Sequence, residues 1–374
     1  MPSSSPLPTS AGVTVLQSCI TQITPDGLRY RGFAIEDLAR NATYEDVAWL
    51  LWTGDLPSAA QRAAMLDAIA AGMDLPQPIR AAAAALPAGA PPIARLEVLL
   101  PLLPLYVPAL AEDSTLPGEE RAARLLGAFV ALTGCTMRPE PPTDVPRSVA
   151  AAFLALVRGD EPPPEHVRAL EQVLILYADH ELNASTFAGR VAASTRADLV
   201  SAVLAALSTL RGPLHGGVDR HVRALIAAAE HEGARLVVER YVRAATPLPG
   251  FGHAVYREVD PRGVLMRDLA RALAPAAGLE RLLAVMEAIE TEAARHGRGP
   301  LNVDFYTVPL YRALRIPDVL STLVFATGRM AGWTAHILEQ YADNRLIRPR
   351  AAYAGPAPRP WPVERAAASA SASS

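Results

Sequence analysis

Apolar residues recur three or four positions apart along most of this chain, as they do on the buried face of a helix. One run begins at Val167 and ends at Asp179, and its apolar members lie at positions 170, 173, 174 and 177. Strict alternation of apolar and polar residues appears only near Thr14–Ile23 and Leu28–Phe33, where a small hairpin is expected. The pattern therefore predicts an all-α protein with a small N-terminal β-hairpin.

Capping residues indicate where several helices begin. The signals are Thr43 with Asp46, Ser58 with Gln61, Thr195 with Asp198, and Asp260 followed by a proline at the first helical position. The helix after Thr195 is expected to reach Leu210 and to stop at Gly212-Pro213, and the helix after Asp260 to reach Leu273. Prolines are frequent from Pro76 to Pro164, so short helices are expected in that segment.

The composition indicates a globular protein that does not depend on charge for its partners. Hydrophobic residues make up 51% of the 374 positions and charged residues 20%, which suits a large buried core in two domains. A net charge of −3 favours neither nucleic acid nor an anionic membrane. The sequence contains no lysine, so Schiff-base chemistry on lysine and lysine-based phosphate loops are excluded.

Cysteine usage and the chain ends suggest a cytoplasmic protein. Cys19 and Cys135 match no metal or redox spacing, which fits a reduced compartment. Residues 1–12 lack the features of a signal peptide, and the apolar stretch Val98–Ala111 is too short and too rich in proline to span a membrane. Both ends, residues 1–12 and 356–374, are rich in small or polar residues and proline and are expected to be disordered.

Three histidines and one aspartate lie in segments where glycine or a helix end exposes the backbone to a ligand. These segments are Asp179-His180-Glu181-Leu182-Asn183, Gly212-Pro213-Leu214-His215-Gly216-Gly217, Pro249-Gly250-Phe251-Gly252-His253-Ala254-Val255-Tyr256, and Asn302-Val303-Asp304-Phe305-Tyr306. No His-x-x-x-His pair indicates zinc, no Gly-x-Gly-x-x-Gly follows a strand, and no Gly-x-Ser-x-Gly elbow is present. Metal, dinucleotide and serine-hydrolase sites are therefore not indicated.

The order of these motifs resembles that of the citrate synthase family over about residues 13–355. The matching segments are Leu28-Arg29-Tyr30-Arg31-Gly32, His-Glu-Leu-Asn-Ala-Ser-Thr-Phe from His180, Gly-Pro-Leu-His-Gly-Gly from Gly212, Gly-Phe-Gly-His-Ala-Val-Tyr-Arg from Gly250 with Asp-Pro-Arg from Asp260, Asn-Val-Asp-Phe-Tyr from Asn302, Arg-Met-Ala-Gly-Trp from Arg329, and Ile-Arg-Pro-Arg from Ile347. Residues 75–150 contribute almost nothing to the resemblance.

The resemblance implies a role for each matched residue. His215 is similar to the donor to the thioester oxygen, Asp304 to the base that removes the α-proton, and His253 to the group that polarises the oxaloacetate carbonyl. The family's substrate-binding positions are matched by His180, Arg262, Arg329 and Arg348. Arg348 matches an arginine that reaches across a dimer into the partner's site. The family's CoA-binding loop is matched by Pro249, Gly250, Phe251, Gly252 and Arg257. Arg257 could equally be a solvated surface residue.

The resemblance also implies the fold and the reaction. A large helical domain is expected from residues 13–215 and 314–355, and a smaller mobile domain from 216–313. A homodimer with shared active sites is expected to condense acetyl-CoA with oxaloacetate and hydrolyse the product to citrate, without a metal or cofactor. The alternatives are propionyl-CoA as substrate, giving 2-methylcitrate, and a weakly active paralogue with a binding or regulatory role.

Two departures from the family pattern leave the acyl group open. Val218-Asp219 follow the glycines after His215, where the family usually has Ala-Asn, and Thr307-Val308 stand where it usually has Ser-Gly. A valine in place of glycine adds bulk close to Asp304. The aromatic Trp333 and nearby His336 are expected to pack within a helix and not to bind ligand.

Overall fold

The structure is a computed structural model, and it describes residues 14–24, 27–111, 113–138, 142, 145–216, 218–253 and 255–359. The predicted disorder of residues 1–12 and of 360–374 concerns segments outside the described residues. For Val218 and Asp219 only the backbone is described.

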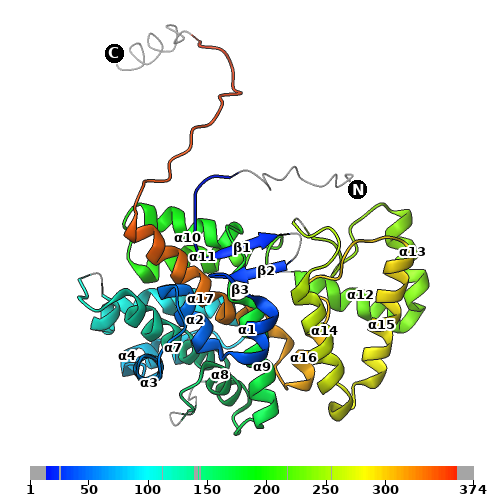
Figure 1. The fold of residues 1–374 in the computed structure, drawn as a ribbon, viewed down its shortest axis with the longest axis horizontal. Helices are drawn as coiled ribbons and strands as arrows, with labels where there is room; N and C mark the ends of the chain where they lie inside the picture. The colour runs from blue at the N-terminus through cyan, green and yellow to red at the C-terminus, as the bar shows by residue number, and fades with distance from the viewer. Residues whose placement is uncertain are drawn as a thin grey trace, which may run out of the picture.

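The described residues are predominantly α-helical, so the predicted fold class is confirmed (Figure 1). The α-helices are α1 (Ile35–Asn41), α2 (Tyr44–Thr53), α3 (Ala59–Met73), α4 (Gln77–Ala85), α5 (Pro92–Leu99), α6 (Leu103–Tyr106), α7 (Gly118–Met137), α8 (Val149–Arg158), α9 (Pro164–Tyr177), α10 (Ala184–Ser194), α11 (Leu199–Leu210), α12 (Val218–Glu232), α13 (Ala234–Arg243), α14 (Pro261–Leu273), α15 (Glu280–Arg295), α16 (Thr307–Ala313) and α17 (Ser321–Ala342). Short 3-10 helices are η1 (Leu100–Leu102), η2 (Pro108–Leu110), η3 (Pro275–Ala277) and η4 (Asp318–Leu320).

A small antiparallel sheet lies near the N-terminus and extends the predicted hairpin by one strand. Its strands β1 (Thr21–Thr24), β2 (Gly27–Tyr30) and β3 (Phe33–Ala34) are paired in that order, with Thr21 opposite Tyr30 and Tyr30 opposite Phe33. The turn between β2 and β3 holds Arg31 at φ 48°, and the Arg31 guanidinium donates two bonds to the carbonyl of Leu51. These bonds tie the sheet to the end of α2.

Most predicted helix starts are confirmed by their caps. Thr43 with Asp46 and Ser58 with Gln61 form capping boxes, and Asp260 accepts the N–H of Arg262 ahead of α14. The predicted start at Thr195 is wrong by three residues, because Asp198 is the N-cap of α11 and accepts from Ser201. Thr195 ends α10 instead, and its hydroxyl donates to the carbonyl of Ala192.

The proline-rich segment contains one long helix that the sequence analysis did not predict. Helices α4, α5 and α6 are short, as expected, but α7 has 20 residues. Pro117 is its N-cap residue, and the next proline in the sequence, Pro139, follows the helix, so no proline interrupts it. Burial of most of α7 against α3 and α8 then stabilises the full length.

Helix α17 forms the centre of the larger part of the molecule. It is buried along most of its length and packs against α2, α7, α9, α10 and α11. Helices α12 to α15 gather beside this body, and α14 packs on α1, α9 and α16 (Figure 1). The boundaries predicted for the smaller domain, 216–313, stay a prediction. Within the described residues, no helix has the length and apolar character needed to cross a membrane.

Candidate active site

His180 lies directly after α9, in a turn that buried side chains hold in place. The Tyr30 hydroxyl donates to the carbonyl of Asp179 (2.9 Å) and accepts its N–H (3.2 Å). Glu181 follows at φ 50°, and its N–H donates to the Asp179 carboxylate (3.0 Å). The backbone on both sides of His180 is therefore fixed by hydrogen bonds.

A chain of buried polar groups extends this support into α17. Arg190 donates to His336 Nδ1 (2.9 Å), so His336 carries its proton on Nε2, which faces the Asp179 carboxylate at 3.4 Å. Burial alone raises the pKa of Asp179, but His336 and Arg329 hold this pKa below its ordinary value. His336 is buried, as a packing role requires, and it also orients the residue next to His180.

His180 meets two residues from the loop before α14. Its Nε2 is 3.3 Å from the Tyr256 hydroxyl, and its ring centroid is 5.1 Å from that of His253. Burial, together with the positive charges of Arg262 and Arg329, lowers the pKa of His180 well below its usual value. His180 is therefore a neutral imidazole at physiological pH.

The protonation of His253 follows from its backbone contacts. Its Nδ1 lies within 3.0 Å of the Val255 N–H and 3.3 Å of the Tyr256 N–H, so this nitrogen accepts and Nε2 carries the proton. Burial, and then the charge of Arg262, lower the pKa of His253 to about 4, so the ring is neutral. Nε2 lies 3.3 Å from Nη2 of Arg262, which can only donate. Two donor nitrogens thus lie side by side.

Arg262 is fixed at the start of α14. Its Nε and Nη2 atoms donate to the two carboxylate oxygens of Asp260 at 3.0 and 2.9 Å, and both side chains are buried. Burial by itself lowers the pKa of Arg262, but Asp260 outweighs this and raises it. Arg262 is therefore a permanent cation at the N-terminus of a helix, where an anion is also favoured.

Arg329 lies in the middle of α17 and is almost fully buried. Its Nε donates to the carbonyl of Tyr177 (2.6 Å), and its guanidinium lies 4.6 Å from the centre of the Phe325 ring. Burial lowers the pKa of Arg329. Its charge in turn helps to lower the pKa of both His180 and His215, so it is close enough to influence both histidines.

His215 is oriented by a serine hydroxyl. Its Nε2 is 2.8 Å from Ser185 Oγ, which also lies 2.7 Å from the side-chain oxygen of Asn183 and accepts the indole N–H of Trp333 at 3.1 Å. Burial, followed by the charge of Arg329, lowers the pKa of His215 to about 4. His215 is therefore neutral at physiological pH.

Asp304 lies in a loop that is tied to the segment carrying His253. The Asn302 N–H donates to Gly250 and its side-chain amide to Gly252, and the Asn302 side-chain oxygen accepts the N–H of Asp304 (3.0 Å). Gly250 has φ 85°, and a Cβ there would lie 2.4 Å from the Phe305 ring. Asp304, at half-buried depth, thus has its backbone held relative to the loop of His253.

The predicted CoA-loop residues are only partly placed by these contacts. Pro249, Gly250, Phe251 and Gly252 run beside the segment of Asp304, with the Phe251 and Phe305 rings 4.7 Å apart. Arg257 is exposed, and so is Arg348, which lies in the extended segment after α17 that leads away from the helical body (Figure 1). The single chain therefore brings Arg348 to none of the other site residues.

Three side chains at the site were missed as functional residues from the sequence. Ser185 orients His215, Trp333 donates to Ser185, and Tyr256 contacts His180. Ser185 and Tyr256 each lie within a motif that had been singled out for its histidine. Their position inside these motifs was the sequence signal that could have identified them as functional residues.

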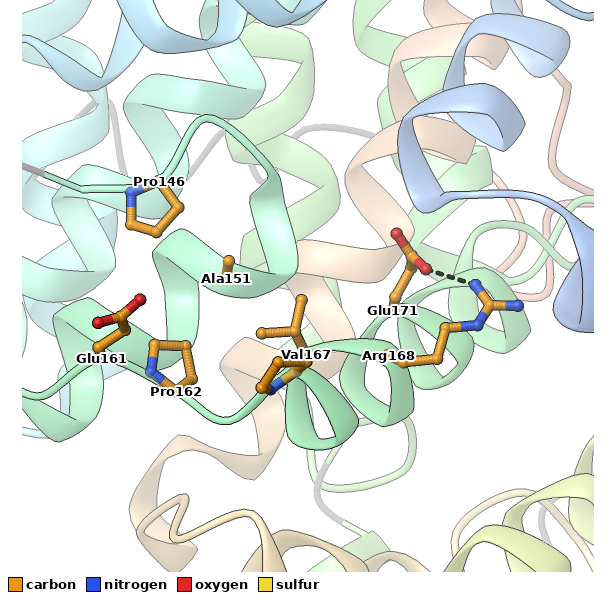
Figure 2. A pocket seen from close by; sticks show the side chains of 8 residues that line it. Pro146, Ala151, Glu161, Pro162, Val167, Arg168 and Glu171 are labelled. Atoms are coloured by element: carbon orange, nitrogen blue, oxygen red, sulfur yellow. Dashed lines mark hydrogen bonds and ion pairs between the residues drawn. The ribbon is translucent and has the colours of Figure 1, made fainter.

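The cluster is distinct from the hollow drawn in Figure 2. That surface hollow of about 330 Å³ lies at α8 and α9 and is lined by Pro146, Ala151, Glu161, Pro162, Pro164, Val167, Arg168 and Glu171. Three of its eight lining residues are prolines, and the Arg168–Glu171 ion pair lies on one side. Among the described residues, no group of three or more His, Cys, Asp or Glu side chains is arranged to hold a metal ion.

Comparison with known proteins gives one consistent result. Residues 9–350 match the family described as "Citrate synthase, C-terminal domain". The 2-methylcitrate synthase of Shewanella oneidensis is 37% identical over 360 residues, covering 94% of each chain, and citrate synthase 2 of Bacillus subtilis is 36% identical, covering 92% of this chain and 95% of that protein. A solved structure of Thermoplasma acidophilum citrate synthase, in a ternary complex with carboxymethyl coenzyme A and oxaloacetate, superposes with a TM-score of 0.83 at 29% identity, covering 95% of this chain and 98% of that one.

Proposed function

The chain belongs to the citrate synthase family of acyltransferases, and on this premise we propose that it condenses acetyl-CoA with oxaloacetate and hydrolyses the product to citrate and CoA. The observation that carries the proposal is the pair of donors, His253 Nε2–H and Arg262 Nη2–H, 3.3 Å apart. Neither can accept from the other, so an acceptor oxygen beside the pair, within reach of both, is needed to satisfy them. The ketone oxygen of oxaloacetate suits this position, because it gains negative charge when its carbon is attacked.

The carboxylates of oxaloacetate require fixed donors and cations, and the surrounding residues can supply them. Arg262 is held rigidly by Asp260, and Arg329 by the carbonyl of Tyr177. Burial keeps these guanidinium groups out of bulk solvent. Charge-assisted hydrogen bonds are stronger in this low-dielectric interior than in water. His180 adds a neutral polar group beside them.

The acyl side of the reaction needs a base and a donor together. Unassisted removal of a thioester α-proton by a carboxylate is uphill by roughly 20 kcal/mol. We assign the base to Asp304 and the donor to His215, which bonds the thioester oxygen as the proton leaves and gives an enol. The Ser185 hydroxyl donates to Asn183 Oδ1 in the structure; when it turns to donate to His215 Nε2 instead, the ring proton is on Nδ1, which can then donate to the thioester oxygen.

Carbon–carbon bond formation and hydrolysis then follow. The enol carbon attacks the ketone carbon of oxaloacetate, and the enol hydroxyl returns its proton to His215 as the thioester C=O re-forms. The electron pair of the ketone C=O moves to the ketone oxygen, which His253 and Arg262 stabilise. The resulting thioester is cleaved by water, releasing CoA and citrate. All steps use the side chains of the protein and the two substrates, so no metal or cofactor enters this proposal.

The second candidate reaction uses propionyl-CoA and gives 2-methylcitrate. Curated relatives of both kinds are almost equally similar, at 37% and 36% identity, so similarity alone does not select the acyl group. Val308 stands where the family usually has glycine, and its side chain is buried four positions after Asp304. We expect its bulk to restrict the acyl pocket, which favours acetyl-CoA over the longer propionyl-CoA.

We further propose a cytoplasmic homodimer in which Arg348 completes the site of the partner. Arg348 is exposed on a segment that leaves the helical body, so it is available to another chain (Figure 1). Two-fold symmetric dimers are the commonest soluble homo-oligomers, and the symmetry lets each chain supply the same residue to the site of the other.

Measurement of thiol release with oxaloacetate and either acetyl-CoA or propionyl-CoA tests the function. We expect turnover with acetyl-CoA and a lower kcat/KM with propionyl-CoA. A higher kcat/KM with propionyl-CoA supports the second candidate. Oxaloacetate binding without thiol release from either substrate supports the weakly active paralogue and contradicts our assignment.

A further inference from the structure

Tyr256 is placed among the residues assigned to oxaloacetate, although none of its contacts is required by the reaction described above. Its side chain is 5% exposed. The ring lies 4.8 Å from the ring of His253, and the Arg262 guanidinium lies 5.8 Å from its centre. The hydroxyl lies 3.3 Å from His180 Nε2. One side chain therefore contacts His180, His253 and Arg262, three of the residues assigned to oxaloacetate.

A phenol in this position can do more than fill space. Its ring is held by His253 and Arg262, so the oxygen has a fixed place, while the O–H bond can turn freely about the ring axis. With neutral His180 in the tautomer that carries its proton on Nε2, the hydroxyl accepts from that N–H and can donate its own proton to another oxygen at the same time. A leucine or phenylalanine would pack equally well but could not do this.

We propose that Tyr256 is a substrate-binding residue of the oxaloacetate site, whose hydroxyl accepts a hydrogen bond from His180 and donates one to a substrate carboxylate. This inference rests on the proposed function, because it names a further donor for the same substrate. It also gives His180 a defined role: the imidazole orients the phenol and strengthens it as a donor through the linked hydrogen bonds. The proposed role involves hydrogen bonds only, with no covalent step and no proton transfer.

The decisive comparison is calorimetric titration of oxaloacetate into the full-length protein and its Tyr256→Phe variant. The variant keeps the ring against His253 and Arg262 and removes only the hydroxyl. Loss of a hydrogen bond to a charged group is expected to weaken the Kd for oxaloacetate by about tenfold or more. The KM for the acyl-CoA at saturating oxaloacetate is expected to stay within about twofold, because Tyr256 is not assigned to that substrate.

Tyr341→Phe is the matched control, since its hydroxyl donates to the carbonyl of Ala197, between α10 and α11, and contacts none of the binding groups. Tyr256→His is the second variant; it returns a donor to the same side of the site and is expected to recover part of the lost affinity. Thermal unfolding checks that each variant is folded.

Three results are informative. A folded Tyr256→Phe variant that binds oxaloacetate as tightly as the unaltered protein overturns the inference. A Tyr256→Phe variant in which the KM for the acyl-CoA rises as much as the Kd for oxaloacetate also overturns it, because the loss is then not confined to the oxaloacetate site. Failure of the unaltered protein to bind oxaloacetate contradicts the proposed function itself, and so differs from a failure confined to Tyr256.

Discussion

The electrostatic character of the site is decided by individual residues. Burial lowers the pKa of His215 and of His253 to about 4, and neighbouring arginines add to the effect. Both imidazoles are thus neutral across the physiological range, and each has one ring nitrogen that donates a hydrogen bond and one that accepts. A neutral donor suits an enol mechanism, because it stabilises the developing charge on oxygen without first competing for the proton that the base removes.

Replacement of Asp304 tests the assignment of the base. Asp304→Asn is nearly isosteric, and the backbone N–H and carbonyl bonds of this residue to Asn302 and Thr307 can persist. We expect kcat in the thiol-release assay to fall by about two to four orders of magnitude, because the amide cannot accept the α-proton. Oxaloacetate affinity, measured by calorimetry, is the control and should change little. Near-normal turnover in this variant would remove Asp304 from the mechanism.

At the scale of elements, the site depends on loops that are fastened to one another. The loop of Gly250 to His253 precedes α14, and the loop of Asn302 to Asp304 precedes α16, yet both are joined by backbone and amide hydrogen bonds. Gly250 is required at this junction by its positive φ and by the Phe305 ring, which leaves no space for a side chain. Two segments far apart in sequence therefore form one rigid unit.

The junction of α2, α8 and α9 contains a second group of buried charges, remote from the histidines. Glu45 on α2 accepts the N–H of Val149 at the start of α8 (2.7 Å). Burial, with the nearby carboxylates of Glu171 and Asp46, raises the pKa of Glu45 to about 7. Arg168 forms an ion pair with Glu171, and Arg62 forms one with Asp46. Of these three carboxylates, Glu45 is the one for which the described residues show no ion pair with an arginine.

Glu45 is expected to make the stability of the fold depend on pH. Because its pKa is higher in the folded than in the unfolded chain, the folded state binds the extra proton between about pH 4.5 and pH 7, so this contribution to stability is lost as the pH rises through that window. Glu45→Gln keeps the acceptor for Val149 and removes the charge. We expect the substitution to increase the free energy of unfolding more at pH 8 than at pH 5, by up to roughly 3 kcal/mol.

Thermal unfolding at the two pH values measures this difference. Glu165→Gln, at an exposed position on α9, is the matched control and should leave the pH dependence unchanged. A Glu45→Gln variant whose Tm follows the unaltered protein at both pH values would show that Glu45 has an ordinary pKa in the folded state.

At the scale of the whole molecule, oxaloacetate is expected to draw the two parts of the chain together. His180 and Arg329 belong to the body around α17, whereas Arg262 belongs to α14 in the group beside it (Figure 1). A ligand that contacts both favours the closed arrangement and so prepares the acyl-CoA site. By linkage, each substrate must tighten the other by the same factor.

This coupling can be measured by titrating a non-reactive CoA thioester analogue with and without saturating oxaloacetate. We expect the analogue to bind about 5- to 150-fold more tightly when oxaloacetate is present. Malate, which has a hydroxyl in place of the ketone, serves as the comparison for a dicarboxylate of the same length. Equal affinities in all titrations would exclude closure as the link between the sites.

Shared active sites predict complementation between two inactive chains. An Arg348→Ala chain and a His215→Gln chain should each be inactive as homodimers, but random pairing makes half of the dimers hybrids, with one intact site in each. About a quarter of all sites should then regain turnover. Arg350→Ala, altered at a neighbouring exposed arginine, is the control and should stay active alone. Mixtures that remain inactive after demonstrated subunit exchange would argue against the shared site.

The sequence by itself determined the fold class, most helix starts and the grouping of candidate residues into motifs. These features are local: a cap such as Ser58 with Gln61 bonds within its own turn, and apolar spacing depends only on the period of the helix. The start at Thr195 failed because two polar residues three positions apart could both cap, and only packing selects between them. The length of α7 failed because proline density says little about a segment that happens to lie between prolines.

Tertiary structure alone decided how the motifs meet. No local rule brings His180 within 3.3 Å of the Tyr256 hydroxyl, since this contact depends on how α9 packs against α14 and the loop before it. The neutrality of the histidines has the same origin, because desolvation is set by the neighbours that cover a side chain and not by the side chain itself. Residue types were readable from the sequence, but their protonation states and mutual geometry required the folded chain.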